Sequence, residues 1–115
     1  MSIRDIIKSA LDVKKEIVKC PEWGVEIEVR TMTGRQRAIL LRSSVDDKDQ
    51  FMQEKFQTGI VIACCFDPET EEKIFQITDE EWLLEKSAGP VERLARKAMD
   101  LSGLTENALL ETEKN

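Results

Sequence analysis

The sequence predicts an α+β domain that is mainly α, with four or five helices packed around a central apolar helix and one N-terminal β-hairpin. Three observations favour this fold class. The longest apolar run, residues 51–66, carries its apolar side chains at the spacing of a helix. Residues 25–30 follow a turn signal and alternate apolar with charged side chains, as a half-buried strand does. Residues 34–44 and 90–101 carry further apolar stripes of helical period.

Length and composition indicate one soluble domain. The chain has 115 residues, of which 41% are hydrophobic and 35% charged, and its net charge is −6. We expect residues 1–104 to form a single domain and residues 105–115 to form a C-terminal tail. The negative charge disfavours non-specific binding to nucleic acid or anionic membranes. No run is long enough to span a membrane and the N-terminus lacks a signal-peptide core, so we expect a cytoplasmic protein.

The first segment predicts a short amphipathic helix. Ser2 and Asp5 have the spacing of a capping box. The apolar stripe that follows consists of Ile3, Ile6, Ile7, Ala10 and Leu11. A helix of this length is marginally stable alone, so its stripe should dock either on its own domain, which is the favoured alternative, or on another chain.

A β-hairpin is predicted at about residues 16–31. The segment Pro21-Glu22-Trp23-Gly24 has turn chemistry between two extended runs. In the second run three apolar residues point to one face, which should lie on the helical core: Val25, Ile27 and Val29. We interpret Trp23 as a lid on this core in preference to a binding residue.

The next two helices have recognisable starts. Thr33 and Gln36 form a capping box for a helix over residues 34–44, and Asp47 with Gln50 has the spacing that starts the central helix. The β-branched residues 60–62 also fit a strand. The helix is favoured because a run of sixteen residues exceeds the usual strand length.

The last third predicts a turn, a short extended piece and two helices. Residues 67–70 form the turn, and residues 73–75 return from it. Thr78 and Glu81 have capping-box spacing before a short helix that contains Trp82. Pro90 starts the final helix, and Gly103 followed by Leu104 is typical of its C-terminal cap.

The residue types argue against enzyme activity and against bound cofactors or metals. The chain has no histidine and no tyrosine, so it lacks the commonest general base and metal ligand. Its three cysteines, Cys20, Cys64 and Cys65, form no disulfide framework and no CxxC pattern, and we expect them to be buried apolar residues. The acidic clusters fall in a turn and at a helix start, where carboxylates stabilise exposed N–H groups.

Charge is unevenly placed along the chain. Residues 30–44 hold four arginines and no acid, whereas residues 67–86 hold eight acids and two lysines. These stretches are either two solvated surfaces or complementary patches that guide self-association or recruit a charged partner. The candidate protein-interaction residues are Ile3, Ile7, Leu11, Arg35, Arg37 and Arg42. Without interleaved aromatic residues, the arginines make a weak case for nucleic-acid binding.

Three stretches together resemble a known family. They are DVKKEIVKCPEWGVEIEVRTMTGRQR (residues 12–37), CFDPETEEKIF (65–75) and KSAGPVERLARKAMDLSGL (86–104). Their order resembles the tail assembly chaperones of tailed bacteriophages and prophages, especially those of Gram-positive hosts. The resemblance covers nearly the whole chain, but it consists of core and turn residues and transfers no contact motif.

The resemblance implies a protein that binds the tape measure protein, keeps its long helices soluble and helps recruit tail tube subunits. It also implies location in the host cell cytoplasm and absence from the mature virion. The alternative is a small structural or head-to-tail connector protein of the virion. A nucleic-acid-binding regulator is the third possibility, and strongly salt-dependent DNA binding would support it.

Overall fold

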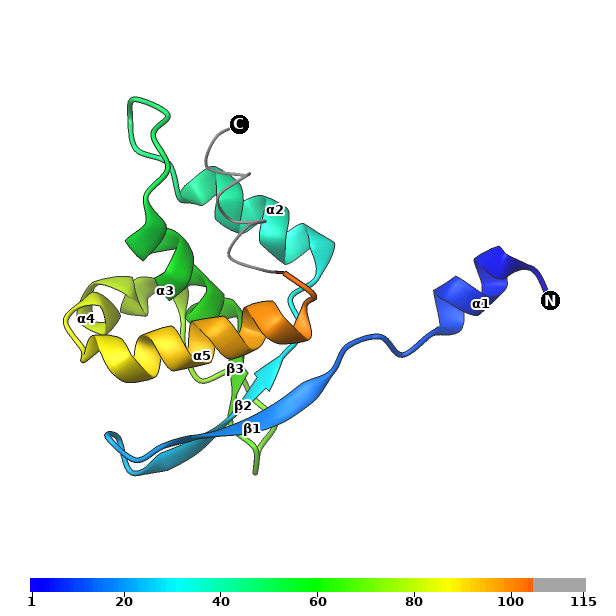
Figure 1. Ribbon diagram of the computed structural model, residues 1–115, viewed down its shortest axis with the longest axis horizontal. Helices are drawn as coiled ribbons and strands as arrows, with labels where there is room; N and C mark the ends of the chain where they lie inside the picture. The colour runs from blue at the N-terminus through cyan, green and yellow to red at the C-terminus, as the bar shows by residue number, and fades with distance from the viewer. Residues whose placement is uncertain (105–115) are drawn as a thin grey trace.

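The computed structural model describes residues 1–104, and the tail predicted for residues 105–115 lies outside this part. The described chain is α+β, as predicted, and about half of it is helical (Figure 1). Its elements in chain order are α1 (Ile3–Ser9), β1 (Lys15–Cys20), β2 (Val25–Arg30), α2 (Gly34–Ser43), α3 (Gln53–Cys64), β3 (Cys65–Phe66), the 3-10 helix η1 (Ile77–Asp79), α4 (Glu80–Leu84) and α5 (Ala88–Leu101).

The three strands form an antiparallel sheet in the order β1-β2-β3. β1 and β2 pair along their full length, with Cys20 opposite Val25 beside the turn. In that turn the Trp23 N–H donates to the Cys20 carbonyl at 3.0 Å, and Gly24 has φ +67°. This left-handed backbone conformation explains the glycine, because side chains disfavour it.

The central helix is shorter than the apolar run, residues 51–66, for which it was predicted. The helix α3 starts only at Gln53, because the Asp46 carboxylate accepts bonds from the N–H groups of Lys48 and Gln50 and closes a turn there. The predicted Asp47 start is therefore wrong. The helix ends at Cys64, and the next two residues form β3, which pairs with β2. In this pairing Cys65 lies opposite Val29 and Phe66 opposite Glu28, so the backbone of β3 bonds to β2 and no longer to the helix.

The core lies between one face of the sheet and the helices α3, α4 and α5, which stand on the same side of it (Figure 1). Ile60 of α3 and Leu94 of α5 are among the largest fully buried side chains. The cysteines are free and buried, as predicted. Burial raises the pKa of the Cys64 thiol to about 11, so it stays protonated at neutral pH.

The helix starts and ends are encoded locally. The predicted capping box at the start of α2 is confirmed, with the Gln36 N–H donating to Thr33 Oγ1 at 3.2 Å. The predicted cap after α5 is also confirmed. There Gly103 has φ +71°, and the Leu104 N–H donates to the Met99 carbonyl at 2.8 Å.

The contact between α2 and α3 depends on Gly59. A Cβ added at this glycine would collide with Cδ2 of the buried Leu40. We expect Gly59→Val to lower the free energy of unfolding by about 1–3 kcal/mol, because overpacking outweighs the gain in helix propensity. Denaturant unfolding measures this change. In a chain that also carries Leu40→Ala, the same valine should cost less, and an undiminished cost would contradict the proposed collision.

An ion pair ties the hairpin turn to α5. Arg93 donates from Nη1 to Glu22 Oε1 at 3.0 Å and from Nη2 to Glu22 Oε2 at 2.8 Å. This two-point geometry is the strongest that an arginine and a carboxylate can adopt. The hydrogen bonds from Arg93, and to a smaller extent a backbone hydrogen bond of Glu22 itself, lower the pKa of Glu22 to about 2.

This lowered pKa gives stability a predictable pH dependence. The ionised Glu22 favours the folded state, so its contribution is present above the unfolded pKa near 4.5 and is lost as the pH falls towards 2. We therefore expect Glu22→Gln to reduce the free energy of unfolding at pH 7 and to change it little at pH 2. Denaturant curves at both pH values check this. In an Arg93→Gln background the pH dependence of the Glu22→Gln effect should become much smaller, because only the backbone hydrogen bond of Glu22 then lowers its pKa.

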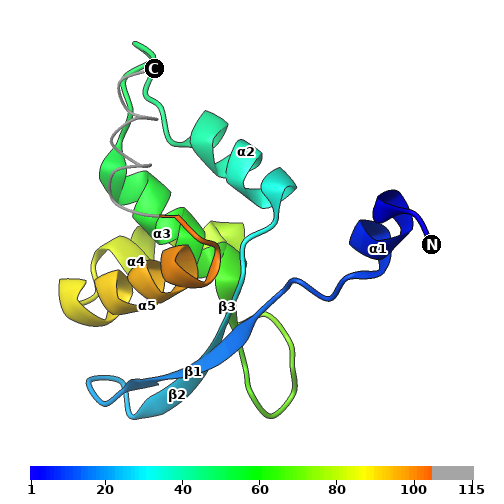
Figure 2. The ribbon, with the colours of Figure 1, turned by 45° about the vertical axis from the view of Figure 1, so that its right-hand side comes forward.

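The N-terminal helix α1 stands apart from the domain on an extended arm, in both views (Figures 1 and 2). Ser2 caps it as predicted, but the helix ends at Ser9 and buries none of its residues. The favoured expectation that its stripe packs on its own domain is therefore wrong. Lys14 anchors the base of the arm, because its N–H donates to Thr31 Oγ1 at 2.8 Å and its carbonyl accepts from the Thr31 N–H at 3.0 Å.

Candidate functional site

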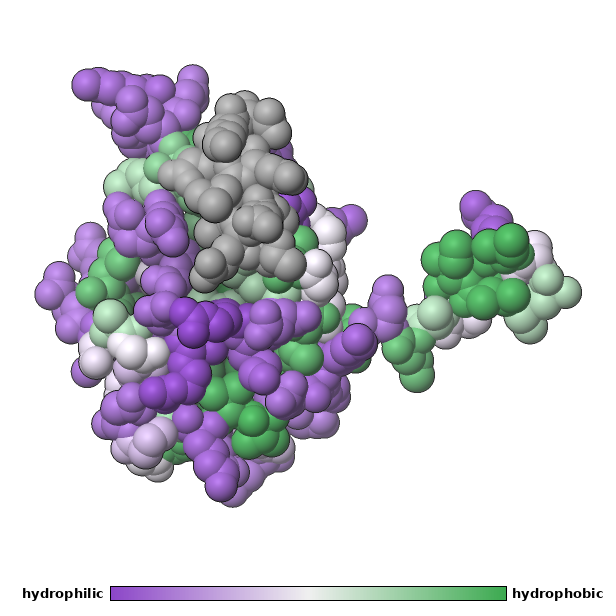
Figure 3. All heavy atoms as spheres, viewed as in Figure 1, coloured by the Kyte–Doolittle hydropathy of each residue, from purple (hydrophilic) through white to green (hydrophobic). Residues whose placement is uncertain are grey.

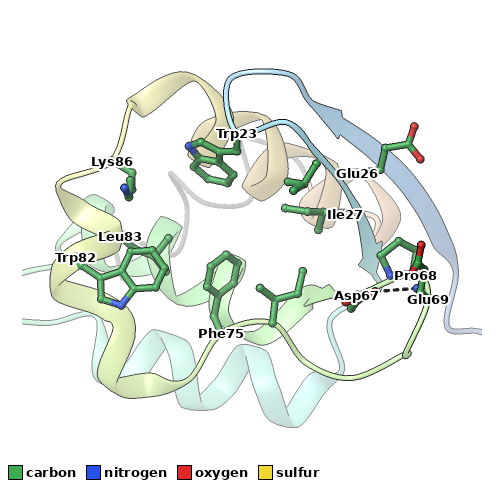
Figure 4. Close-up of a pocket in the computed structure, with 12 residues that line it drawn as sticks. Trp23, Glu26, Ile27, Asp67, Pro68, Glu69, Phe75, Trp82, Leu83 and Lys86 are labelled. Atoms are coloured by element: carbon green, nitrogen blue, oxygen red, sulfur yellow. Dashed lines mark hydrogen bonds between the residues drawn. The ribbon is translucent and has the colours of Figure 1, made fainter.

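A groove of about 790 Å³ lies between the hairpin, the segment that follows β3, and α4 (Figure 4). Most of its lining is apolar and comes from elements that are distant in the sequence. The apolar lining residues are Trp23, Val25, Ile27, Ile74, Phe75, Trp82 and Leu83. The others are Glu26, Asp67, Pro68, Glu69 and Lys86.

The apolar lining has a buried floor and exposed walls. The floor consists of Ile27, Phe75 and Leu83, which belong to the hydrophobic core. The walls consist of Val25, Ile74 and Trp82, which remain between 39% and 48% exposed. The predicted inward face of β2 is thus only partly covered, because Val25 opens into the groove. Adjacent apolar walls that stay in contact with water are typical of an interaction surface.

Trp82 is held in place by two contacts. Its Nε1 donates to Asp79 Oδ1 at 2.9 Å, and its ring lies 5.9 Å from the Phe75 ring at an angle of 54°. Asp79 Oδ2 also accepts the Gln76 N–H at 2.8 Å. The bonds from Gln76 and then from Trp82 lower the pKa of Asp79. The carboxylate therefore stays ionised and keeps the indole oriented as one wall of the groove.

This arrangement corrects the predicted start of the short helix. Thr78 and Glu81 do not form its capping box. The reciprocal cap is made by Gln76 and Asp79, two residues earlier, and a turn of 3-10 helix precedes α4. Asp79 accepts hydrogen bonds from the Gln76 N–H and from the Trp82 indole N–H. The spacing of Thr78 and Glu81 does not reveal this role.

The charged lining residues lie at opposite ends of the groove. Asp67 and Glu69 are at one end, and Lys86 is at the other, near Trp82 (Figure 4). Asp67 Oδ1 accepts the Glu69 N–H at 2.8 Å, which fixes the turn at the acidic end. The Glu26 side chain points away from the hollow (Figure 4). A bound segment would therefore meet an apolar centre with carboxylates at one end.

The predicted apolar interaction residues lie outside this groove. Ile3 and Ile7 belong to α1, and Leu11 belongs to the arm that follows it. Their side chains are between 69% and 100% exposed. Figure 3 shows the apolar patch that α1 presents to solvent. The chain thus carries a second apolar surface, separate from the groove.

The three predicted arginines all belong to α2, and none of them lines the groove. Arg35 and Arg42 are exposed, whereas Arg37 is half-buried. Arg30 is on β2, where its Nε donates to Glu28 Oε2 at 2.8 Å and its guanidinium lies 3.8 Å from the centre of the Phe66 ring. Self-association through the arginines of α2 stays a prediction.

No cluster of three or more potential metal ligands occurs within residues 1–104, and no helix in this part is long and apolar enough to cross a membrane.

The arrangement of the groove suits the binding of a helix. A small-molecule pocket usually has polar groups that converge on its ligand, whereas here the charged groups lie at the ends. An exposed apolar hollow of this kind fits the apolar face of a helix.

The groove could not be located from the sequence. Trp23 packs against the core, as a lid would, and also lines the groove. The one sequence feature that could have indicated the groove is Trp82, because a large aromatic residue in an otherwise acidic stretch often belongs to an interaction surface. The facing wall of the groove is formed by Val25 of the hairpin, which is distant from Trp82 in the sequence, so no local pattern joins the two.

Comparison with solved structures identifies a fold relative that covers most of the chain. No protein-family model and no curated protein sequence match. Among solved structures, the tail assembly chaperone of bacteriophage HK97 matches with a TM-score of 0.60 and 20% sequence identity, over 85% of this chain and 95% of that one. At this identity the match concerns architecture. The chain therefore shares the fold of the bacteriophage HK97 tail assembly chaperone.

Proposed function

We propose that this protein is a tail assembly chaperone of a tailed bacteriophage or prophage, of the kind found in Gram-positive hosts. The observation that carries the proposal is the fold shared with the HK97 tail assembly chaperone over 85% of this chain and 95% of that one. The sequence resemblance to the same family supports it independently. The proposed partners are the tape measure protein and the tail tube protein, and the proposed location is the host cytoplasm, with the protein absent from the mature virion.

The groove is the proposed site for the tape measure protein. A long protein of amphipathic helices exposes apolar stripes until it is assembled, and these stripes cause aggregation. The half-exposed walls at Val25, Ile74 and Trp82 offer such a stripe an apolar surface. Binding there shields the client without any covalent step. A client helix with basic residues beside its stripe would also be attracted to Asp67 and Glu69.

Co-expression with the tape measure protein of the same gene cluster tests this function. We expect the chaperone to shift the tape measure protein from the pellet to the soluble fraction. The variant Ile74→Glu should abolish the shift, because it places a charge on an apolar wall. The backbone N–H of residue 74, which donates to the Cys65 carbonyl at 3.2 Å, is unaffected by the change.

The matched control is Ile39→Glu, which makes the same change at an exposed position on α2. It should keep the tape measure protein soluble. A tape measure protein that precipitates equally with and without the wild-type chaperone would contradict the function. Finding the protein in purified virions would instead favour the structural or connector role.

A further inference from the structure

The outward face of α2 carries one apolar side chain between two arginines. Arg35, Ile39 and Arg42 are spaced i, i+4 and i+7, so at 100° per residue they project from one side of the helix. Leu40 projects from the inner side and packs on α3. Ile39 is 52% exposed, and none of the ion pairs within residues 1–104 uses Arg35 or Arg42. This face therefore offers an apolar centre with a positive charge at each end.

The chain leaves α5 beside the start of α2. The Met32 N–H donates to Ser102 Oγ at 2.8 Å, and Thr31 Oγ1 lies 3.4 Å from the carbonyl oxygen of Leu101. Both contacts join residues that are 70 positions apart. The residues that follow Leu104 must therefore start near the first turn of α2.

The chain after residue 104 has a matching pattern in its sequence, TENALLETEKN (residues 105–115). Glu106, Leu110 and Glu113 are again spaced i, i+4 and i+7, with an acid wherever α2 has an arginine. In a helix, Leu109 would lie on the same side and face the small side chain of Ala38. The two faces are therefore complementary in charge at both ends and apolar in the middle.

The same segment has local sequence signals for a short helix. Thr105 suits the N-cap position, and a carboxylate in the first turn with Lys114 in the last turn complements the helix dipole. Most residues between them are good helix formers. A helix of about nine residues is marginal alone, so it needs a surface on which to pack.

We infer that residues 106–114 form a helix that docks on the outward face of α2 in the same chain, with both helices pointing the same way. Leu110 then meets Ile39 at the apolar centre. Glu113 meets Arg42 at the far end, with the same offset of 71 positions along the chain. This offset is nearly the 70 positions of the two contacts beside the start of α2, so the register is set where the chain leaves α5.

The connection allows this placement. Four residues separate Ser102 from Glu106, and they can span up to about 14 Å. Packed helices lie about 8–10 Å apart, a separation that glutamate and arginine side chains bridge together. Because the segment is tethered beside its site, its effective concentration exceeds that of a free partner, which favours the contact within one chain.

This contact changes how α2 can bind other molecules. The exposed arginines of the basic stretch, residues 30–44, would be covered by carboxylates of their own chain. A negatively charged partner would then have to displace the segment before it reached α2. The inference is independent of the proposed function, because the groove for the tape measure protein has no lining residue from α2.

NMR spectroscopy of the full chain tests the contact. In the wild-type protein we expect helical Cα chemical shifts for residues 106–114 and a nuclear Overhauser effect between the methyl groups of Leu110 and Ile39. Leu110→Asp places a charge at the apolar centre and should lower the docking equilibrium constant by at least about tenfold, with loss of the helical shifts.

The matched control is Ala108→Asp, which makes the same kind of change on the opposite side of the segment's helix. It should keep both the helical shifts and the methyl contact. Random-coil shifts in the wild-type protein would overturn the inference, and so would equal effects of the two aspartates.

A charge exchange tests the orientation. Glu113→Arg should weaken docking, because it places two positive charges together. Adding Arg42→Glu should restore part of the docking, whereas adding Arg35→Glu to the same Glu113→Arg chain should restore much less. Stronger restoration by Arg35→Glu would show that the helices are antiparallel and would overturn the proposed register.

A mixture of isotope-labelled and unlabelled copies tests whether the contact lies within one chain. The effect between Leu110 and Ile39 should arise only inside labelled chains, and an effect between copies would overturn the inference. Failure of this contact is separable from failure of the chaperone function. Leu110→Asp leaves every described residue of the groove unchanged, so this variant should still keep the tape measure protein soluble.

Discussion

Leu94→Ala is expected to lower the free energy of unfolding by about 3–5 kcal/mol. Leu94 is fully buried on α5, where this helix packs against α3 and the sheet. Truncation removes apolar contacts and leaves a cavity that rigid neighbours cannot fill. Because a domain of this size has only about 5–15 kcal/mol of stability, the variant should be marginally folded at 37 °C.

Denaturant unfolding followed by circular dichroism measures this loss. Leu84→Ala on α4 is the control, since Leu84 is partly exposed and should cost less than about 1 kcal/mol. Equal losses for the two leucines would show that the Leu94 side chain is not packed in the core.

Trp82→Ala is expected to weaken binding of the tape measure protein by at least about 30-fold. Trp82 is the largest of the half-exposed wall residues, and its orientation is fixed by Asp79 and by the Phe75 ring. Such pre-oriented aromatic side chains contribute most to binding, because little rotational freedom is lost on contact. Titration of the chaperone into a soluble fragment of the tape measure protein measures the affinity.

Two further variants separate a binding role from a folding role. Trp82→Phe keeps an aromatic wall but lacks the N–H that donates to Asp79, so it should retain most of the affinity. Ile77→Ala removes an exposed apolar side chain from η1, outside the groove, and should bind as the wild type does. Unchanged affinity of Trp82→Ala with normal circular dichroism would show that this wall does not contact the client.

Local signals predicted much of this fold. The Thr33 capping box and the cap at Gly103 were correct, because each depends on hydrogen bonds between residues close in the sequence. The period of the apolar residues also identified where helices occur. The class α+β followed from these elements.

The differences arose where distant segments interact. Cys65 leaves the helical pattern because it pairs with Val29 of β2, and no local signal encodes that pairing. The groove is likewise made by the hairpin, the segment after β3 and α4. The periodicity of α1 correctly indicated an apolar stripe, but it could not show that the stripe faces away from its own domain.

Site-specific crosslinking to the tape measure protein tests the central claim most directly. A photoreactive residue in place of Val25 sits on a groove wall, and one in place of Arg35 sits on the exposed side of α2. If the groove holds the client, position 25 should crosslink to the tape measure protein and position 35 should not. Crosslinks from position 35 alone, or from neither position, would contradict the assignment of the groove as the client site.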